Sequence, residues 1–188
     1  KILHDSGLDL NVHYDGMGTR VTREWLNCPE FIRDPKAMES AFRWSRRVRG
    51  KSDRKKALRA DVIVTTSGML DGGPALWYLN RLRHDGSNAI LLTGYQAEGS
   101  GGRKLLERGS LPIFGNQTTI PLEVDKFDLS NHADHTSLCK FARECSPSDV
   151  VIFHADEAAA DAVGDDLAGE TRVHKPTNNE TIQIPPPI

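Results

Sequence analysis

Two histidines stand where an apolar stretch of the chain gives way to small and acidic residues. His132 follows the apolar and acidic segment 120–129, and His154 follows the apolar run 149–153. In parallel α/β folds, ligands and catalytic groups collect at such strand ends. Histidine suits proton transfer or metal binding there, because its pKa lies near neutrality and its ring nitrogens coordinate metals. A lone strand-end histidine more often has a structural role, but carboxylates closely follow both of these, which favours a site.

Two glycine-rich loops each lie between an apolar run and a predicted helix. Residues 67–73 (SGMLDGG) follow the run 61–66, and residues 94–102 (GYQAEGSGG) follow the run 89–93. Glycine lets the backbone approach an anion closely and a helix N-terminus favours negative charge, so both loops are candidate phosphate sites. The alternative is ordinary tight-turn chemistry without a ligand. Neither loop has a complete dinucleotide fingerprint or a Walker motif, which disfavours a nucleotide-binding Rossmann module.

The apolar pattern predicts an α/β scaffold for these residues. The runs 61–66 and 89–93 are typical of strands buried on both faces, and each continues into a loop and a helix. Two such units in succession predict a Rossmann-like parallel sheet. A strand at 10–14 and a helix from Pro35 to Val48, capped by Asp34, precede them.

The pattern of apolar and polar residues changes after residue 109. Two β segments about a turn at 115–116 are predicted within 111–129, followed by a helix at 135–145. A strand at 149–153, a helix at 155–167 and short strands at 171–175 and 181–184 complete the prediction. We therefore expect one domain at residues 1–109 and a second at residues 110–188.

Composition narrows the class of protein. The 188 residues carry a formal net charge of −2 and contain no apolar run of the roughly 20 residues that span a bilayer. No signal peptide is apparent, so a cytoplasmic protein without a membrane partner is expected. The chain begins at Lys1 rather than methionine, and we expect it to be a piece of a longer protein. Three cysteines without C-x-x-C spacing predict neither a disulfide framework nor a zinc knuckle, and Cys139 and Cys145 are expected to be buried.

Positive charge is concentrated in one segment. Residues 43–59 hold nine basic residues and one acid, Asp53. The segment is either a solvated helix end and loop, with residues 50–53 as the flexible part, or a surface that follows the phosphates of a polyanion. Trp44 within it either stacks on a base or packs inward.

Four motifs together resemble the β-CASP branch of the metallo-β-lactamase superfamily. They are SGM at 67–69, GYQAEGSGGR at 94–103, SNHADH at 130–135 and HADE at 154–157. The resemblance is greatest to the RNA-processing members, the mRNA 3′-end processing endonucleases and their exonuclease-like relatives. It implies that residues 1–109 are part of a β-CASP domain. Residues 110–188 would then be the C-terminal part of the metallo-β-lactamase αββα fold, with its RNA-specificity region.

The resemblance also implies roles for individual residues. His132 corresponds to the histidine of the S-x-H-A-D motif, a general acid or phosphate stabiliser, with Ser130 and Asp134 in support. His154 corresponds to a zinc ligand in an H-G-E motif whose glycine is replaced here by Ala155. A metal pair of His132 with His135 is disfavoured, because His132 is expected to precede the helix.

The two glycine-rich loops are expected to line the substrate cleft. Arg103 would be either a phosphate contact or a member of a structural ion pair. The expected substrate-binding residues are Ser67, Gly68, Met69, Gly94, Tyr95, Gly99, Ser100 and Arg103.

The metal centre of such an enzyme would not be complete in this chain. The family holds two zinc ions mainly with an H-x-H-x-D-H motif, and no H-x-H occurs in the 188 residues. We expect the chain to be a fragment of an RNA-cleaving hydrolase. The fragment would be inactive without the missing N-terminal portion of the protein. Its expected partners are that portion and RNA. The alternative is a non-catalytic RNA-binding or scaffolding paralogue. A homodimer is compatible with the sequence, which does not distinguish endonuclease from exonuclease or RNA from DNA as substrate.

Overall fold

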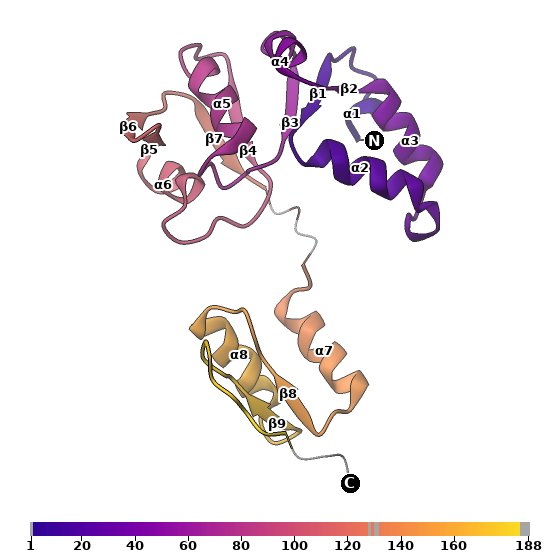
Figure 1. Cartoon of the computed structure of the whole chain (residues 1–188), viewed down its shortest axis with the longest axis vertical. Coiled ribbons are helices and arrows are strands. Elements are labelled where there is room, and N and C mark those ends of the chain that lie inside the picture. Colours follow the sequence, from indigo (N-terminus) through magenta and orange to yellow (C-terminus); the bar gives the residue numbers. More distant parts are fainter. Residues whose placement is uncertain (1, 128, 130–131, 185–188) are drawn as a thin grey trace. The chain divides into compact units, whose positions relative to one another are not determined.

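The computed structural model describes residues 2–127, 129 and 132–184 of an α/β protein with two compact units, Lys1–Leu129 (unit 1) and Ser130–Ile188 (unit 2) (Figure 1). Every pair of strands in the described residues is parallel except one hairpin. No helix among these residues is long and apolar enough to cross a membrane.

The first half of unit 1 is built on a parallel sheet of three strands in the order β2-β1-β3. Val12–Asp15 of β1 pairs along its whole length with Val62–Thr65 of β3, and β2 is a two-residue edge strand. In chain order the elements are α1 (Ile2–Asp5), β1 (Val12–Asp15), α2 (Gly18–Asn27), the 3₁₀ helix η1 (Pro29–Phe31), α3 (Pro35–Trp44), β2 (Arg46–Arg47), α4 (Lys51–Ala57) and β3 (Val62–Thr65).

The second half of unit 1 contains the main apolar core. Its elements are α5 (Gly73–Leu82), β4 (Ala89–Leu92), α6 (Gly101–Arg108), β5 (Ser110–Ile113), β6 (Asn116–Thr119) and β7 (Glu123–Lys126). Strand β4 pairs in parallel with β7, while β5 and β6 form the hairpin. Leu79 of α5, Leu92 of β4, Leu105 of α6 and Leu111 of β5 are buried together, and Leu70 of the first glycine-rich loop belongs to the same core.

Unit 2 is a small βαβ arrangement preceded by a helix. It contains α7 (His135–Cys145), β8 (Asp149–Val151), α8 (Glu157–Leu167) and β9 (Arg172–His174), with β8 and β9 parallel. Helices α7 and α8 both run opposite to β8 (Figure 1). The loop that enters α7 and the loop that leaves β8 therefore lie at the same end of unit 2.

Most predicted elements are confirmed, including the N-cap of α3, where Asp34 accepts a hydrogen bond of 2.9 Å from the Ala37 N–H. The helix expected from Pro35 to Val48 instead ends at Trp44. Ser45 is extended, and residues 46–47 pair with β1 because this parallel pairing satisfies their backbone groups in place of helical hydrogen bonds.

Three other local predictions are wrong. Residues 50–53, expected to be a loop, open helix α4. Residues 181–184 form no strand. Cys139 is buried as expected, but Cys145 at the end of α7 is exposed.

The two strand–loop–helix units do not share one hydrogen-bonded sheet. Strand β3 belongs to the three-stranded sheet, whereas β4 pairs with β7. Residues 110–129 lie in unit 1 because β7 pairs with β4 and Leu111 joins the core. The domain boundary at residue 109 stays a prediction.

Candidate functional site

The two glycine-rich loops lie in direct contact in unit 1. The Gly102 N–H donates to the Met69 carbonyl oxygen at 2.6 Å, and the Gly101 N–H donates to the Asp71 carboxylate at 2.7 Å. A Cβ on Gly101 would lie 2.5 Å from the Leu70 carbonyl oxygen, closer than real Cβ contacts. Glycine is therefore required where α6 begins, because the neighbouring backbone occupies the space of a side chain.

Gln96 is a buried polar residue in this contact that the sequence analysis missed. Its Nε2 donates to the Gly94 carbonyl oxygen at 3.2 Å, while its buried Oε1 has no hydrogen-bond partner among the described residues. A Cβ on Gly102 would overlap that oxygen. The G-G pair at 101–102 was the signal in the sequence, since two adjacent glycines at a helix start indicate close packing there.

The predicted substrate-binding residues around these loops have different surroundings. Met69 and Tyr95 are exposed, whereas Ser100 is buried and its Oγ accepts from the Arg103 N–H at 3.2 Å, capping α6. Ser67 has a φ of +70°, a left-handed conformation that is uncommon for a residue with a side chain. Such conformations concentrate at ligand-binding sites, so the conformation of Ser67 is a reason to test its predicted role in substrate binding.

Arg103 forms an ion pair on the surface of α6. Its Nε donates to a carboxylate oxygen of Glu107, one turn along the helix, and both side chains are about half exposed. The structural ion pair weighed from the sequence is therefore present. An exposed pair of this kind contributes little to stability. A phosphate contact by Arg103 stays a prediction.

Asp134 holds the start of α7 in unit 2. Its carboxylate accepts a hydrogen bond of 2.8 Å from the Ser137 N–H, as an N-cap residue does. This hydrogen bond lowers the pKa of Asp134. His132 lies exposed just before α7, so Asp134 caps the helix directly after the segment that carries His132. Because α7 begins at His135, His132 and His135 do not form an H-x-x-H pair within the helix. Ser130 lies outside the described residues.

His154 follows β8 in a left-handed backbone conformation, with φ of +58°. Its imidazole is exposed and lies 6.3 Å, centroid to centroid, from the Phe153 ring. Ala155 is not among the described residues with positive φ, so its methyl group is accommodated where the family pattern has glycine. The loops that carry His132 and His154 lie at the same end of unit 2 (Figure 1).

The basic segment forms a surface on β2 and α4. Arg54 is an exception because it bonds to the buried carboxylate of Asp15. Arg43 lies on α3 and pairs with Glu39. We call the other seven exposed cations of the segment the basic surface: Arg46, Arg47, Arg49, Lys51, Lys55, Lys56 and Arg59. Trp44 is half-buried and makes an edge contact with the His4 ring, with centroids 5.5 Å apart.

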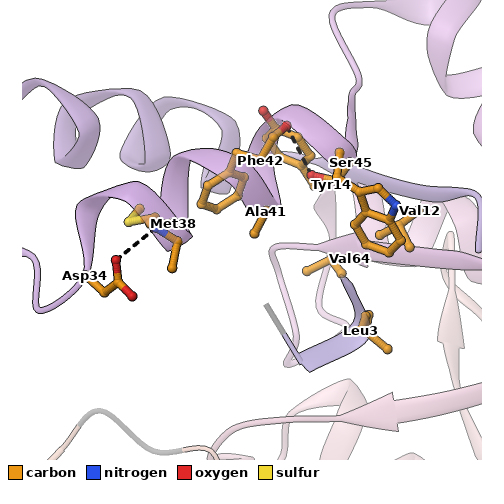
Figure 2. Close-up of a pocket in the computed structure, with 11 residues that line it drawn as sticks. Leu3, Val12, Tyr14, Asp34, Met38, Ala41, Phe42, Ser45 and Val64 are labelled. Carbon is orange, nitrogen blue, oxygen red and sulfur yellow. Dashed lines mark hydrogen bonds between the residues drawn. The ribbon is translucent and has the colours of Figure 1, made fainter. Parts of the chain in front are cut away.

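A separate pocket of about 430 Å³ lies between α3 and strands β1 and β3 (Figure 2). Val12, Met38, Phe42 and Val64 contribute apolar side chains to it, and Trp44 lines it as well. None of the predicted site residues is among those that line it. Trp44 is therefore half-buried beside this pocket, and its predicted stacking on a base stays untested.

The chain is thus an α/β protein with two packed glycine-rich loops in unit 1 and two exposed histidines in unit 2. Residues 2–105 match the family model described as "Beta-Casp domain". Residues 118–176 match the model described as "Zn-dependent metallo-hydrolase RNA specificity domain". The chain belongs to the β-CASP metallo-β-lactamase family of RNA-processing nucleases.

Several curated proteins resemble the chain. "Probable RNase MJ4" of Methanocaldococcus jannaschii is 35% identical over 85% of this chain and 38% of its own length. "RNase aCSPSF2" of Saccharolobus solfataricus is 32% identical over 97% of this chain and 38% of its own length. "Transcription termination factor FttA" of M. jannaschii is 35% identical over 78% of this chain and 26% of its own length. The chain thus spans well under half the length of these relatives.

Proposed function

We propose that this chain is the C-terminal portion of a zinc-dependent ribonuclease that hydrolyses RNA phosphodiester bonds, in mRNA 3′-end processing or in exonuclease-like decay. The observation that carries the proposal is the placement of His132 and His154 in loops at one end of unit 2. Relatives named as ribonucleases, matched over most of the chain, support the reaction class.

Unit 1 would bind the RNA backbone. The loop 67–73 leads into α5, whose N-terminus has no side-chain cap, and the helix dipole favours phosphate there. At the start of α6 the N–H groups of Gly101 and Gly102 are already bonded to Asp71 and Met69. Exposed Tyr95 and Met69 offer apolar surface in these loops, on which a base can stack. The basic surface adds attraction for a polyanion that does not depend on base sequence.

His132 would act on the scissile phosphate. An imidazole donates a proton to a leaving oxygen or hydrogen-bonds to a phosphoryl oxygen, because its pKa lies near neutral pH. Asp134 would serve as a positioning residue, since its bond to the Ser137 N–H fixes the turn between the loop and α7.

His154 would be one zinc ligand. Its exposed imidazole is a suitable donor, since zinc accepts histidine nitrogen, but one imidazole does not hold two ions. When bound, zinc supplies Lewis-acid polarisation of the phosphate. The remaining ligands would come from an H-x-H-x-D-H segment outside these 188 residues, and the fragment alone would not cleave RNA.

The test is to substitute each histidine in the full-length protein that carries this sequence. His154→Ala is expected to lower both zinc content and RNA cleavage, because it deletes a ligand. His132→Ala is expected to leave zinc content unchanged and to slow cleavage by roughly 10²–10⁴-fold, the usual contribution of a positioned acid. Zinc is measured by elemental analysis, and cleavage is measured in single-turnover assays.

His84→Ala provides a matched control, because His84 is an exposed histidine of unit 1 remote in sequence from both motifs. It should change neither quantity. If His132→Ala removes zinc while His154→Ala retains it, the two roles are reversed. If neither substitution affects cleavage, the roles given to the two histidines are wrong. If the full-length protein cleaves no RNA, a non-catalytic RNA-binding or scaffolding role replaces the nuclease.

A further inference from the structure

Three side chains with metal-binding atoms converge between α7 and α8. His135 and Cys139 lie one turn apart on α7, so both face the same side of the helix. Asp166 of α8 reaches the same point, and the three donor atoms all lie within 4.8 Å of one another. His135 ends the SNHADH motif, but neither the family resemblance nor the proposed function gives a role to His135, Cys139 or Asp166.

The spacing of the donor atoms matches a tetrahedral zinc site. His135 Nε2 lies 3.2 Å from Asp166 Oδ2 and 3.7 Å from Cys139 Sγ. Typical zinc bond lengths and tetrahedral angles place such a nitrogen about 3.4 Å from an oxygen ligand and about 3.6 Å from a sulfur ligand. Two of the three donor separations therefore match one ion, and the third, from Cys139 Sγ to the Asp166 carboxylate, lies within 4.8 Å.

The surrounding charges leave one face of Asp166 available. Arg143 lies 3.4 Å from Asp166 Oδ1, whereas Oδ2 faces His135. Glu170 accepts two hydrogen bonds from the Arg143 Nε, at 2.9 and 3.0 Å, and so compensates the guanidinium charge. Hydrogen bonds from Cys139, Arg143 and His135 lower the pKa of Asp166, which keeps it ionised.

From this geometry we infer that His135, Cys139 and Asp166 bind one zinc-type divalent cation that joins α7 to α8. A thiolate, an imidazole and a carboxylate suit zinc, and the exposure of His135 and Asp166 leaves room for water as a fourth ligand. Because α7 begins at His135, the cation would also anchor the helix that follows the His132 loop.

Binding would be coupled to proton release. Burial, followed by the hydrogen bond to Asp166, raises the pKa of the Cys139 thiol, so the thiol carries its proton in the metal-free protein. Zinc takes the thiolate form and displaces that proton.

The experiment uses the 188-residue chain, titrated with Co²⁺ as a spectroscopic probe and then with Zn²⁺ in competition. One equivalent should bind with a thiolate-to-cobalt charge-transfer band, and Cys139→Ala should abolish that band. His135→Ala should weaken binding by more than about tenfold, since loss of supporting residues alone costs about 10- to 100-fold. His135 is exposed, so this second variant tests the site even if the buried Cys139 substitution impairs folding.

Cys145→Ser is the matched control, because Cys145 is an exposed cysteine at the other end of α7. It should retain both the band and the affinity. The inference is overturned if no stoichiometric cobalt binds. It is also overturned if the band persists in Cys139→Ala or disappears in Cys145→Ser.

Discussion

Asp15 at the end of β1 and Arg54 in α4 form a two-point ion pair. Arg54 Nε and Nη2 donate to the two carboxylate oxygens at 2.6 and 3.0 Å. The Tyr78 hydroxyl of α5 donates to the same carboxylate at 2.9 Å. Only 4% of the Asp15 side chain is exposed, so this carboxylate ties together three elements of unit 1, including the helix that carries much of the basic surface.

Arg54→Ala should destabilise unit 1 by about 3 kcal/mol, because it leaves a buried carboxylate without its cation. Tyr78→Phe removes one hydrogen bond to a charged group and should cost about 2 kcal/mol. Urea unfolding measures both, and Arg43→Ala is the control, since it breaks an exposed pair with Glu39. Wild-type stability in Arg54→Ala would show that the pair is dispensable.

Acid should weaken unit 1 through Asp15. Burial acts to raise the pKa of Asp15, but hydrogen bonds from Arg54, Tyr78 and Gly16 outweigh it and leave the pKa below its ordinary value of 3.8. A lowered folded-state pKa contributes stability above the unfolded-state value, and that stability is lost as the pH falls through the folded-state value. Unfolding free energies measured from pH 6 downward should therefore fall below about pH 4.

Asp15→Asn distinguishes this source of acid sensitivity from others. The variant should be less stable than wild type at pH 6, with a difference that shrinks below about pH 4, because the amide side chain has no carboxylate to protonate. A constant difference across that range would assign the acid sensitivity to other groups.

Neutralising part of the basic surface should weaken RNA binding and its dependence on salt. Arg46, Arg47, Lys55 and Lys56 are exposed, and each phosphate contact removed lowers the slope of log affinity against log salt by about 0.7 for a single strand. Alanine substitution of all four, followed by fluorescence anisotropy at several salt concentrations, measures the change.

A charge-matched variant controls for net charge. Arg20, Arg23, Arg33 and Lys36 are also exposed cations of unit 1, on or near α2 and α3. Their substitution by alanine should change the slope less than substitution of the four basic-surface residues. Equal effects would show that RNA responds to overall charge and that the basic surface is merely solvated.

Gly101→Ala should disrupt the contact between the two glycine-rich loops. The new methyl group would meet the Leu70 carbonyl oxygen at 2.5 Å, and overpacking of this kind typically costs about 1–3 kcal/mol. Gly86→Ala is the control, since its Cβ would have nothing within 4 Å. Thermal unfolding and RNA affinity are measured together, and both should fall only in the Gly101 variant. Unchanged values would indicate that the loops are not held by this close approach.

Local patterns in the sequence were sufficient for much of the scaffold. The apolar runs, the Asp34 N-cap and the glycine-rich turns each depend on neighbouring residue types, and the corresponding strands and helices are present. The motifs in these segments also predicted membership of the β-CASP family, and the family models confirm it. The roles of His132 and His154 stay predictions.

Tertiary contacts decided the features that no local pattern encodes. The α3 helix stops at Trp44 because β1, some 30 residues earlier in the chain, offers residues 46–47 a strand partner. Asp15 meets Arg54 and Tyr78 across separations of 39 and 63 residues, and His135 meets Asp166 across 31. Such contacts arise when apolar surfaces are buried together, because close packing brings polar side chains from distant segments within hydrogen-bonding distance. Which distant residues pair with each other was therefore visible only in the folded chain.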